Sequence, residues 1–153
     1  MVEEEERTSD LRGNRLNEFK RILVPVDEGD ESERAFTTAL DLAERVDGKI
    51  TTVHVIEVEP PVLGGIDTNL EEEEAVKGKR ILEKFIDKAG ERSVEHEDIL
   101  VKGEAAREII ERSKTHDLII MGTRGRSTLA SAIMGSVADR VMRRCCCPVL
   151  LIR

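Results

Sequence analysis

A short apolar run followed by spaced glycines, within residues 117–136, constrains the fold of this chain more than any other stretch. Residues 118–121 are continuously apolar, which is typical of a strand that a parallel sheet covers on both faces. Gly122, Gly125 and Gly135 follow this run. Because glycine lacks a Cβ atom, we expect the chain to turn sharply here, with positive φ at Gly125 and Gly135, and to bring backbone N–H groups close to an anion.

Helix signals begin directly after the last of these glycines. Ser136 opens an apolar pattern of helical period, and Asp139 stands three residues later, in the spacing of a capping box. A helix that starts here points its positive dipole end and its unpaired N–H groups at the glycine loop. Strand, glycine loop and helix together predict a phosphate-binding site. The alternative is a plain strand-to-helix connection whose glycines only allow turns.

The glycine spacing, Gly-x2-Gly-x9-Gly-Ser, differs from the two common nucleotide-binding loops. Neither the Walker pattern nor the dinucleotide pattern Gly-x-Gly-x2-Gly occurs in the sequence. At these residues the chain resembles the universal stress proteins of the ATP-binding type, whose motif is Gly-x2-Gly-x9-Gly-[Ser/Thr]. The resemblance covers nearly the whole chain, and the other matching segments are ILVPVD at 22–27, TTVHVIE at 51–57, VKGEAAREII at 101–110 and the terminal PVLLIR.

Strand and helix patterns alternate along the rest of the chain. Apolar runs predict strands at 21–26, 50–58, within 93–102 and at 148–152, and helical periodicity predicts helices at 31–47, 71–89 and around 105–110. Such strand-helix-strand units form right-handed crossovers in a parallel sheet. We therefore expect one α/β domain at residues 18–153 behind a mobile acidic leader at 1–17, with a lid or binding loop at 59–69.

Asp27 is a second candidate site residue, because it directly follows the first predicted strand. Open α/β sheets bind ligands beyond the carboxyl ends of their strands. The same aspartate would also suit a turn ahead of the next helix. In the second predicted strand, we expect His54 to be a satisfied structural residue rather than a catalyst.

The resemblance implies a doubly wound, Rossmann-like open sheet of five mainly parallel strands in the order 3-2-1-4-5. It also implies ATP with Mg²⁺ as the ligand, with Asp27 on the ribose or the metal and the backbone of Val55 on the adenine ring, while the Val55 side chain packs in the core. The implied ribose and phosphate contacts are Gly122, Gly125, Gly135, Ser136 and Val137. The strand-end residues Pro25, Val26 and Met121 complete the candidate set, together with Arg124, for which a solvated surface role is an equal alternative. One departure is Gly29, which stands where the family commonly has serine.

Composition narrows the range of partners. The net charge of −8, from 32 acidic and 24 basic residues, argues against sequence-independent binding of nucleic acid, which needs clustered Lys and Arg. No apolar run approaches the length of a membrane span and the acidic N-terminus lacks a signal-peptide pattern, so we expect a cytoplasmic protein. The adjacent residues 145–147 are all cysteine, which does not match zinc or redox spacing, and packing at a helix end is favoured over a redox switch.

Three function classes remain open. The favoured one is an ATP-binding regulatory or stress-response protein with slow or no hydrolysis, because near the glycine loop only Asp27 could serve as a reacting group. Slow ATP hydrolysis or autophosphorylation at Ser127, Thr128 or Ser131 is the enzymatic alternative. A non-nucleotide interaction dimer of the same fold is the third. In each case the resemblance implies a homodimer paired through the last strand.

Overall fold

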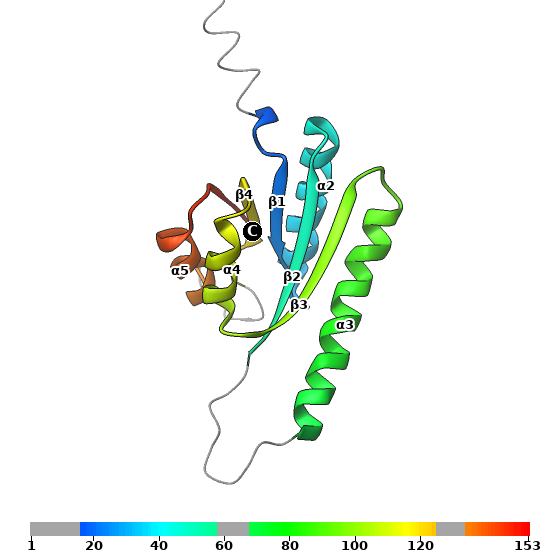
Figure 1. Cartoon of the computed structure of the whole chain (residues 1–153), viewed down its shortest axis with the longest axis vertical. Helices are drawn as coiled ribbons and strands as arrows, with labels where there is room; N and C mark the ends of the chain where they lie inside the picture. The colour runs from blue at the N-terminus through cyan, green and yellow to red at the C-terminus, as the bar shows by residue number, and fades with distance from the viewer. Residues whose placement is uncertain (1–15, 58–67, 125–133) are drawn as a thin grey trace, which may run out of the picture.

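The computed structural model describes residues 16–57, 68–124 and 134–153, and these form a single parallel sheet with helices on both faces (Figure 1). The elements in chain order are β1 (Arg21–Pro25), α2 (Asp30–Val46), β2 (Lys49–Glu57), α3 (Thr68–Gly90), β3 (Glu95–Gly103), α4 (Ala105–Ser113), β4 (Leu118–Gly122), α5 (Ser136–Arg144) and β5 (Val149–Ile152). The strand order is β3-β2-β1-β4-β5, and every neighbouring pair is parallel. The predicted fold class and strand order are therefore confirmed.

The sheet separates the hydrophobic core into two layers, and the buried central strand β1 contributes side chains to both. Ile22 and Val24 face α2 and α3, whereas Leu23 faces α4 and α5, and all three are fully buried. On the first side, the rings of Phe36 from α2 and Phe85 from α3 meet edge to face with centroids 5.0 Å apart. Because neighbouring residues of a strand point to opposite faces, a continuous apolar run serves both layers at once.

Strand β1 lies at the point where the chain changes direction across the sheet. The chain proceeds from β1 outward through β2 to β3 and then returns to build β4 and β5 on the other side. Leu23 is paired with Thr51 of β2 and with Ile119 of β4, so the carboxyl ends of these three strands lie at one edge of the sheet. Open α/β sheets bind ligands in the crevice at such a switch point.

The boundaries of the helices differ from the predicted ones by a few residues. Helix α2 ends at Val46, and its C-cap is Asp47 in the left-handed conformation at φ 53°, rather than the glycine that follows. Gly48 is required for another reason, since a Cβ atom there would lie 3.0 Å from the carbonyl oxygen of Lys20. Helix α3 begins at Thr68, three residues before the predicted start.

Charged side chains join α3 to α2 along their length. Glu33 of α2 accepts hydrogen bonds from Lys84 and Lys88 of α3. One turn beyond α3, Arg92 binds Glu44 and Asp41 of α2 at 2.5 and 2.8 Å. These pairs are partly exposed to solvent, so each adds little to the stability of the contact between the two helices.

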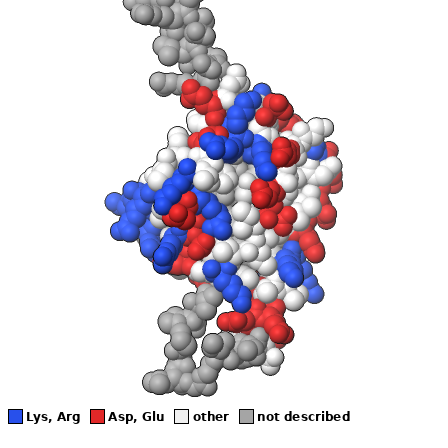
Figure 2. Space-filling model, viewed as in Figure 1, with Lys and Arg blue, Asp and Glu red and all other residues white. Residues whose placement is uncertain are grey.

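The surface around α5, on the other face of the sheet from α2 and α3, carries basic charge. Figure 2 shows Lys and Arg side chains gathering where α5 lies, and Arg140, Arg143 and Arg144 of this helix are exposed. Arg140 is paired with Glu104, and Arg143 is paired with Asp139. The basic surface is therefore partly neutralised by neighbouring carboxylates. Within the described parts of the chain, no helix is both long and apolar enough to cross a bilayer.

Candidate functional site

A cavity of about 550 Å³ lies at the switch point, beyond the carboxyl ends of β1, β2 and β4. Of the eleven candidate residues, Gly125 lies outside the described residues, and the other ten all line this cavity. They are Pro25, Val26, Asp27, Val55, Met121, Gly122, Arg124, Gly135, Ser136 and Val137. Residues that are far apart in the sequence therefore line the same cavity.

Asp27 shapes the corner between β1 and α2. Its Oδ1 atom accepts hydrogen bonds from the Gly29 amide at 2.7 Å and from the Ser32 hydroxyl at 2.9 Å. The Asp27 amide in turn donates to the Ser32 hydroxyl oxygen at 2.9 Å. Asp27 therefore builds the turn into α2, as one interpretation has it, and it also lines the cavity. Gly29 provides no hydroxyl at this corner, and the hydroxyl that binds Asp27 comes from the buried Ser32.

Strand β2 forms one wall of the cavity. The Val26 amide donates to the carbonyl oxygen of Val53 at 2.9 Å, which extends the pairing of the two strands beyond the end of β1. The Nδ1 atom of His54 lies 2.8 Å from the carbonyl oxygen of Val26, and because a carbonyl only accepts, Nδ1 carries the proton. His54 is buried and lines the cavity, and its Nδ1 atom is satisfied by this hydrogen bond. Val55 lines the cavity and also packs against the core.

Close backbone approach explains why residue 135 is glycine. Gly135 has φ −63° and ψ 155°, so the expectation of positive φ at this residue is wrong. A Cβ atom on Gly135 would lie 3.1 Å from the carbonyl oxygen of Thr123, and the Gly135 amide donates to that same oxygen. The two ends of the glycine loop, at Thr123 and Gly135, are therefore joined by a backbone hydrogen bond.

The start of α5 also differs from the prediction. Gly135 is the N-cap and Ser136 is the first helical residue, so the predicted capping box is wrong. The carboxylate of Asp139 accepts from the side chain of Arg143, at 3.0 Å, instead of reaching back to the cap. A glycine cap has no side chain to satisfy the first amides of the helix. The amino end of α5 therefore faces the cavity without a capping side chain of its own.

Glu31 is a residue of this site that sequence reasoning missed. It lies in the first turn of α2, lines the cavity and is buried. Its carboxylate accepts hydrogen bonds from the hydroxyl of Thr123 at 3.2 Å and from the amide and Nε of Arg124 at 2.9 and 3.3 Å. Burial by itself would raise the pKa of Glu31, but these hydrogen bonds outweigh it and hold the pKa below its ordinary value. An ionised carboxylate therefore lies at the base of the glycine loop.

A second, more open cleft of about 970 Å³ lies between α3 and the start of α2. It adjoins the switch-point cavity at Asp27, which lines both. Its wall carries charged side chains that neutralise one another, such as Lys77 and Glu28 with 3.2 Å between nitrogen and oxygen. None of the other candidate residues lines this cleft, so the switch-point cavity is the candidate site.

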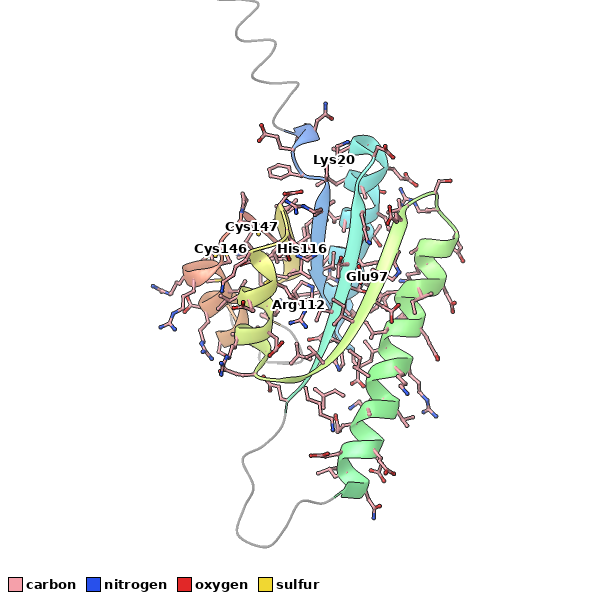
Figure 3. The ribbon with its side chains drawn as sticks, viewed as in Figure 1. Lys20, Glu97, Arg112, His116, Cys146 and Cys147 are labelled. Atoms are coloured by element: carbon pink, nitrogen blue, oxygen red, sulfur yellow. The ribbon has the colours of Figure 1, made fainter. Side chains whose placement is uncertain are left out.

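The three cysteines lie at the amino ends of the strands, on the other side of the sheet from the cavity. They precede β5, whose amino end is at the same edge as that of β4, and Figure 3 shows Cys146 and Cys147 beside α4. The Cys145 thiol donates to the carbonyl oxygen of Cys147 at 3.1 Å, and the Cys146 amide donates to the hydroxyl of Ser113 at 2.8 Å. Burial raises the pKa of Cys147 to about 11. These contacts favour the packing role over a redox switch.

No metal site built from protein side chains alone is present in residues 16–57, 68–124 and 134–153. No three or more His, Cys, Asp or Glu side chains there are grouped so that they could hold an ion.

The fold and this cavity define a class of open α/β proteins with a site at the switch point, and sequence comparison identifies the family. The family model described as the universal stress protein family matches residues 18–153. The chain is 34% identical to a universal stress protein of Methanocaldococcus jannaschii over 149 residues, which covers 92% of this chain and 85% of that protein. It is 33% identical to the universal stress protein YxiE of Bacillus subtilis, over 88% of this chain and 99% of that one. This chain belongs to the universal stress protein family.

Solved structures share the fold. The universal stress protein UspA of Lactobacillus plantarum matches with a TM-score of 0.80 at 24% identity, over 88% of this chain and 98% of that chain. Two others contain nucleotides. A universal stress protein of Archaeoglobus fulgidus in complex with dAMP matches with a TM-score of 0.68 at 23% identity, over 88% of this chain and 98% of that chain. A family member from Arabidopsis thaliana with AMP bound matches with a TM-score of 0.65 at 22% identity, over 87% and 90%.

Proposed function

We propose that this protein binds ATP with Mg²⁺ in the switch-point cavity and acts as a nucleotide-dependent regulatory protein. One observation carries the proposal: a single cavity brings together Asp27, strand β2 and both ends of the glycine loop. The nucleotides in structures of related proteins support the same ligand class. The cytoplasmic location that the sequence predicts is part of this proposal.

The parts of a nucleotide match the parts of the cavity. We assign the adenine ring to the backbone of Val55 on β2 and the ribose to Asp27 at the end of β1, because both residues line the cavity. Gly122, Gly135, Ser136 and Val137 line the side toward α5, and Gly125 belongs to the same motif. The amino end of α5 would attract phosphate through its dipole and the amides of its first turn, by about 0.3–1 kcal/mol per contact.

Magnesium fits this site as a companion of the phosphates. Mg²⁺ is commonly bound by one or two carboxylates together with phosphate oxygens and water. Asp27 provides one such carboxylate at the cavity wall, and its Oδ1 atom is already held by the Gly29 amide and the Ser32 hydroxyl. Asp27 is therefore the residue that would hold the ion, which would help to neutralise the triphosphate.

We propose slow turnover because the ionisable groups beside the glycine loop are already engaged. The sequence suggested that only Asp27 could react there, and the structure adds Glu31. The carboxylate of Glu31 is hydrogen-bonded to Thr123 and Arg124 and has a lowered pKa, which makes it a poor general base. Loop amides that bind the ground state as firmly as the transition state strengthen binding without raising the rate.

Two measurements test the proposal. Denaturing the purified protein and identifying any released nucleotide by mass shows what the cavity holds, and calorimetric titration with AMP, ADP and ATP ranks the ligands. We expect ATP to bind most tightly, with Mg²⁺ strengthening it. Absence of binding to all three nucleotides at millimolar concentration would favour the interaction dimer instead.

Hydrolysis is tested separately. We expect steady-state turnover well below about 1 s⁻¹, the lower end of the common enzyme range. A faster rate that Asp27→Ala abolishes would identify the protein as an enzyme. The candidate autophosphorylation residues Ser127, Thr128 and Ser131 lie outside the described residues.

A further inference from the structure

Glu31 connects two parts of the chain that are far apart in the sequence. It is the second residue of α2, and its partners Thr123 and Arg124 directly follow β4, more than ninety positions later in the sequence. Its side chain is 10% exposed, so it lies inside the structure rather than on the solvated face of the helix. The other two acidic residues of this turn do not share its contacts: Asp30 is exposed, and Glu33 binds lysines of α3.

The backbone of β4 is fitted to Glu31. A Cβ atom on Gly122 would lie 2.7 Å from the Cβ of Glu31 and 2.9 Å from its Oε2. Any other residue at position 122 would therefore push α2 away from the strand end. The first glycine of the motif thus makes room for Glu31, in addition to any contact with a ligand.

The hydrogen bonds of Glu31 restrain the first residues of the loop. The Arg124 amide donates to Oε2 at 2.9 Å, and the Thr123 hydroxyl lies 3.2 Å from both carboxylate oxygens. The carbonyl oxygen of Thr123 accepts from the amide of Gly135. The restraint on Thr123 is thereby passed to the residue that caps α5.

We propose that Glu31 is a positioning residue that anchors the glycine loop, at Thr123 and Arg124, to α2. This inference rests on the proposed function, because it assigns Glu31 to the same site. The carboxylate orients Thr123 and Arg124, and through Thr123 it sets where the amino end of α5 stands. Its effect falls on the phosphate end of the ligand, because its partners lie between β4 and α5 and not on β2, where the base is placed.

Calorimetric titration of Glu31→Ala and Glu31→Gln with ATP and with adenosine tests this role. The alanine variant loses all three hydrogen bonds to the loop, so we expect ATP affinity to fall about tenfold and adenosine affinity to change less than about twofold. The glutamine variant keeps an acceptor for the Arg124 amide but loses the charge, so its ATP affinity should lie between those of the wild type and the alanine variant. Asp30→Asn is the matched control, since it removes one negative charge from the same helical turn and leaves the hydrogen bonds of Glu31 to Thr123 and Arg124 in place.

Hydrogen exchange of the nucleotide-free protein supplies a readout that needs no ligand. The Arg124 amide should exchange about tenfold faster in Glu31→Ala than in the wild type or Asp30→Asn, because its acceptor is gone. Unchanged exchange, an ATP affinity that stays equal or rises, or an equal loss of ATP and adenosine would each overturn the anchoring role. If the wild type binds neither ligand, the proposed function fails, and the exchange rates alone decide whether Glu31 anchors the loop.

Discussion

At the scale of single residues, the two described glycines of the motif have different steric requirements. Gly135 has an ordinary φ, so alanine there is not strained by its own backbone, and its Cβ would press on the Thr123 carbonyl oxygen at 3.1 Å and the Arg124 Cα at 3.3 Å. Gly122→Ala would meet the side chain of Glu31 at 2.7 Å and should lower stability by about 1–3 kcal/mol.

We therefore expect Gly135→Ala to weaken ATP binding while the fold persists. Displacing the loop by a few tenths of an ångström should cost about fivefold to tenfold in affinity, with little change in melting temperature. Calorimetric titration and thermal unfolding measure the two effects. Gly90→Ala is the control, because a Cβ atom there meets nothing within 4 Å. An unchanged ATP affinity in Gly135→Ala would contradict the phosphate role of the loop.

The cysteines should differ in reactivity according to their burial. Cys146 is exposed, whereas the raised pKa of Cys147 keeps its thiol protonated at neutral pH, and only the thiolate is nucleophilic. Iodoacetamide at pH 7.5 should modify Cys146 first and Cys147 more slowly, because Cys147 is partly buried and its thiol is less ionised. Peptide mapping by mass spectrometry gives the order of modification. Equal rates for both thiols would speak against the packing role.

At the scale of elements, the amino ends of β1 and β4 are joined by one ion pair. Asp117 accepts from the Arg21 amide at 2.8 Å and from its guanidinium at 2.8 Å. Because the Arg21 side chain is largely exposed, solvent screening limits the contribution, and Asp117→Asn should reduce the free energy of unfolding by about 1 kcal/mol. Urea unfolding at pH 7 measures this difference, with the exposed Asp30→Asn as the control for net charge.

The same pair should respond to acid. Hydrogen bonding from Arg21 lowers the pKa of Asp117 below its ordinary value. Its stabilising effect is therefore complete above the unfolded pKa of about 3.9 and is lost as the pH falls through the lower folded pKa. The stability difference between the wild type and Asp117→Asn should shrink below about pH 4. A difference that stays constant down to pH 2 would show that the charge of Asp117 contributes nothing.

The sequence predicted elements better than the contacts between them. Residues 118–121 are apolar because both layers cover β4, and such a run is visible without knowledge of the neighbours. The Ser136 and Asp139 spacing was misleading because a serine at the first helical position and a serine at the cap look alike in sequence. Glu31 had no distinguishing signal, since acidic residues are common in the first turn of any helix. Its role depends on Thr123 and Arg124, which only the folded sheet brings near.

At the scale of the whole molecule, β5 leaves an open edge. Within the described residues β5 pairs only with β4, and Leu150 in it is 41% exposed. An unpaired apolar edge associates readily with a second copy, so we expect a homodimer through this strand. Light scattering at micromolar concentration and physiological or higher salt should give twice the chain mass. Leu150→Lys should shift the protein toward a monomer, and a monomeric wild type would refute the dimer.

The pairing of β1 with β4 also affects when the cavity can appear during synthesis. Arg21 and Asp117 are 96 positions apart, so the central strand remains without one neighbour until most of the chain has left the ribosome. At about 5–20 residues per second, synthesis of that stretch takes about 5–20 seconds. The walls of the cavity are complete only once α5 has followed, so an incomplete chain offers nucleotide no finished site. A nucleotide at a hundred times its Kd would add about 2.7 kcal/mol to the finished domain alone.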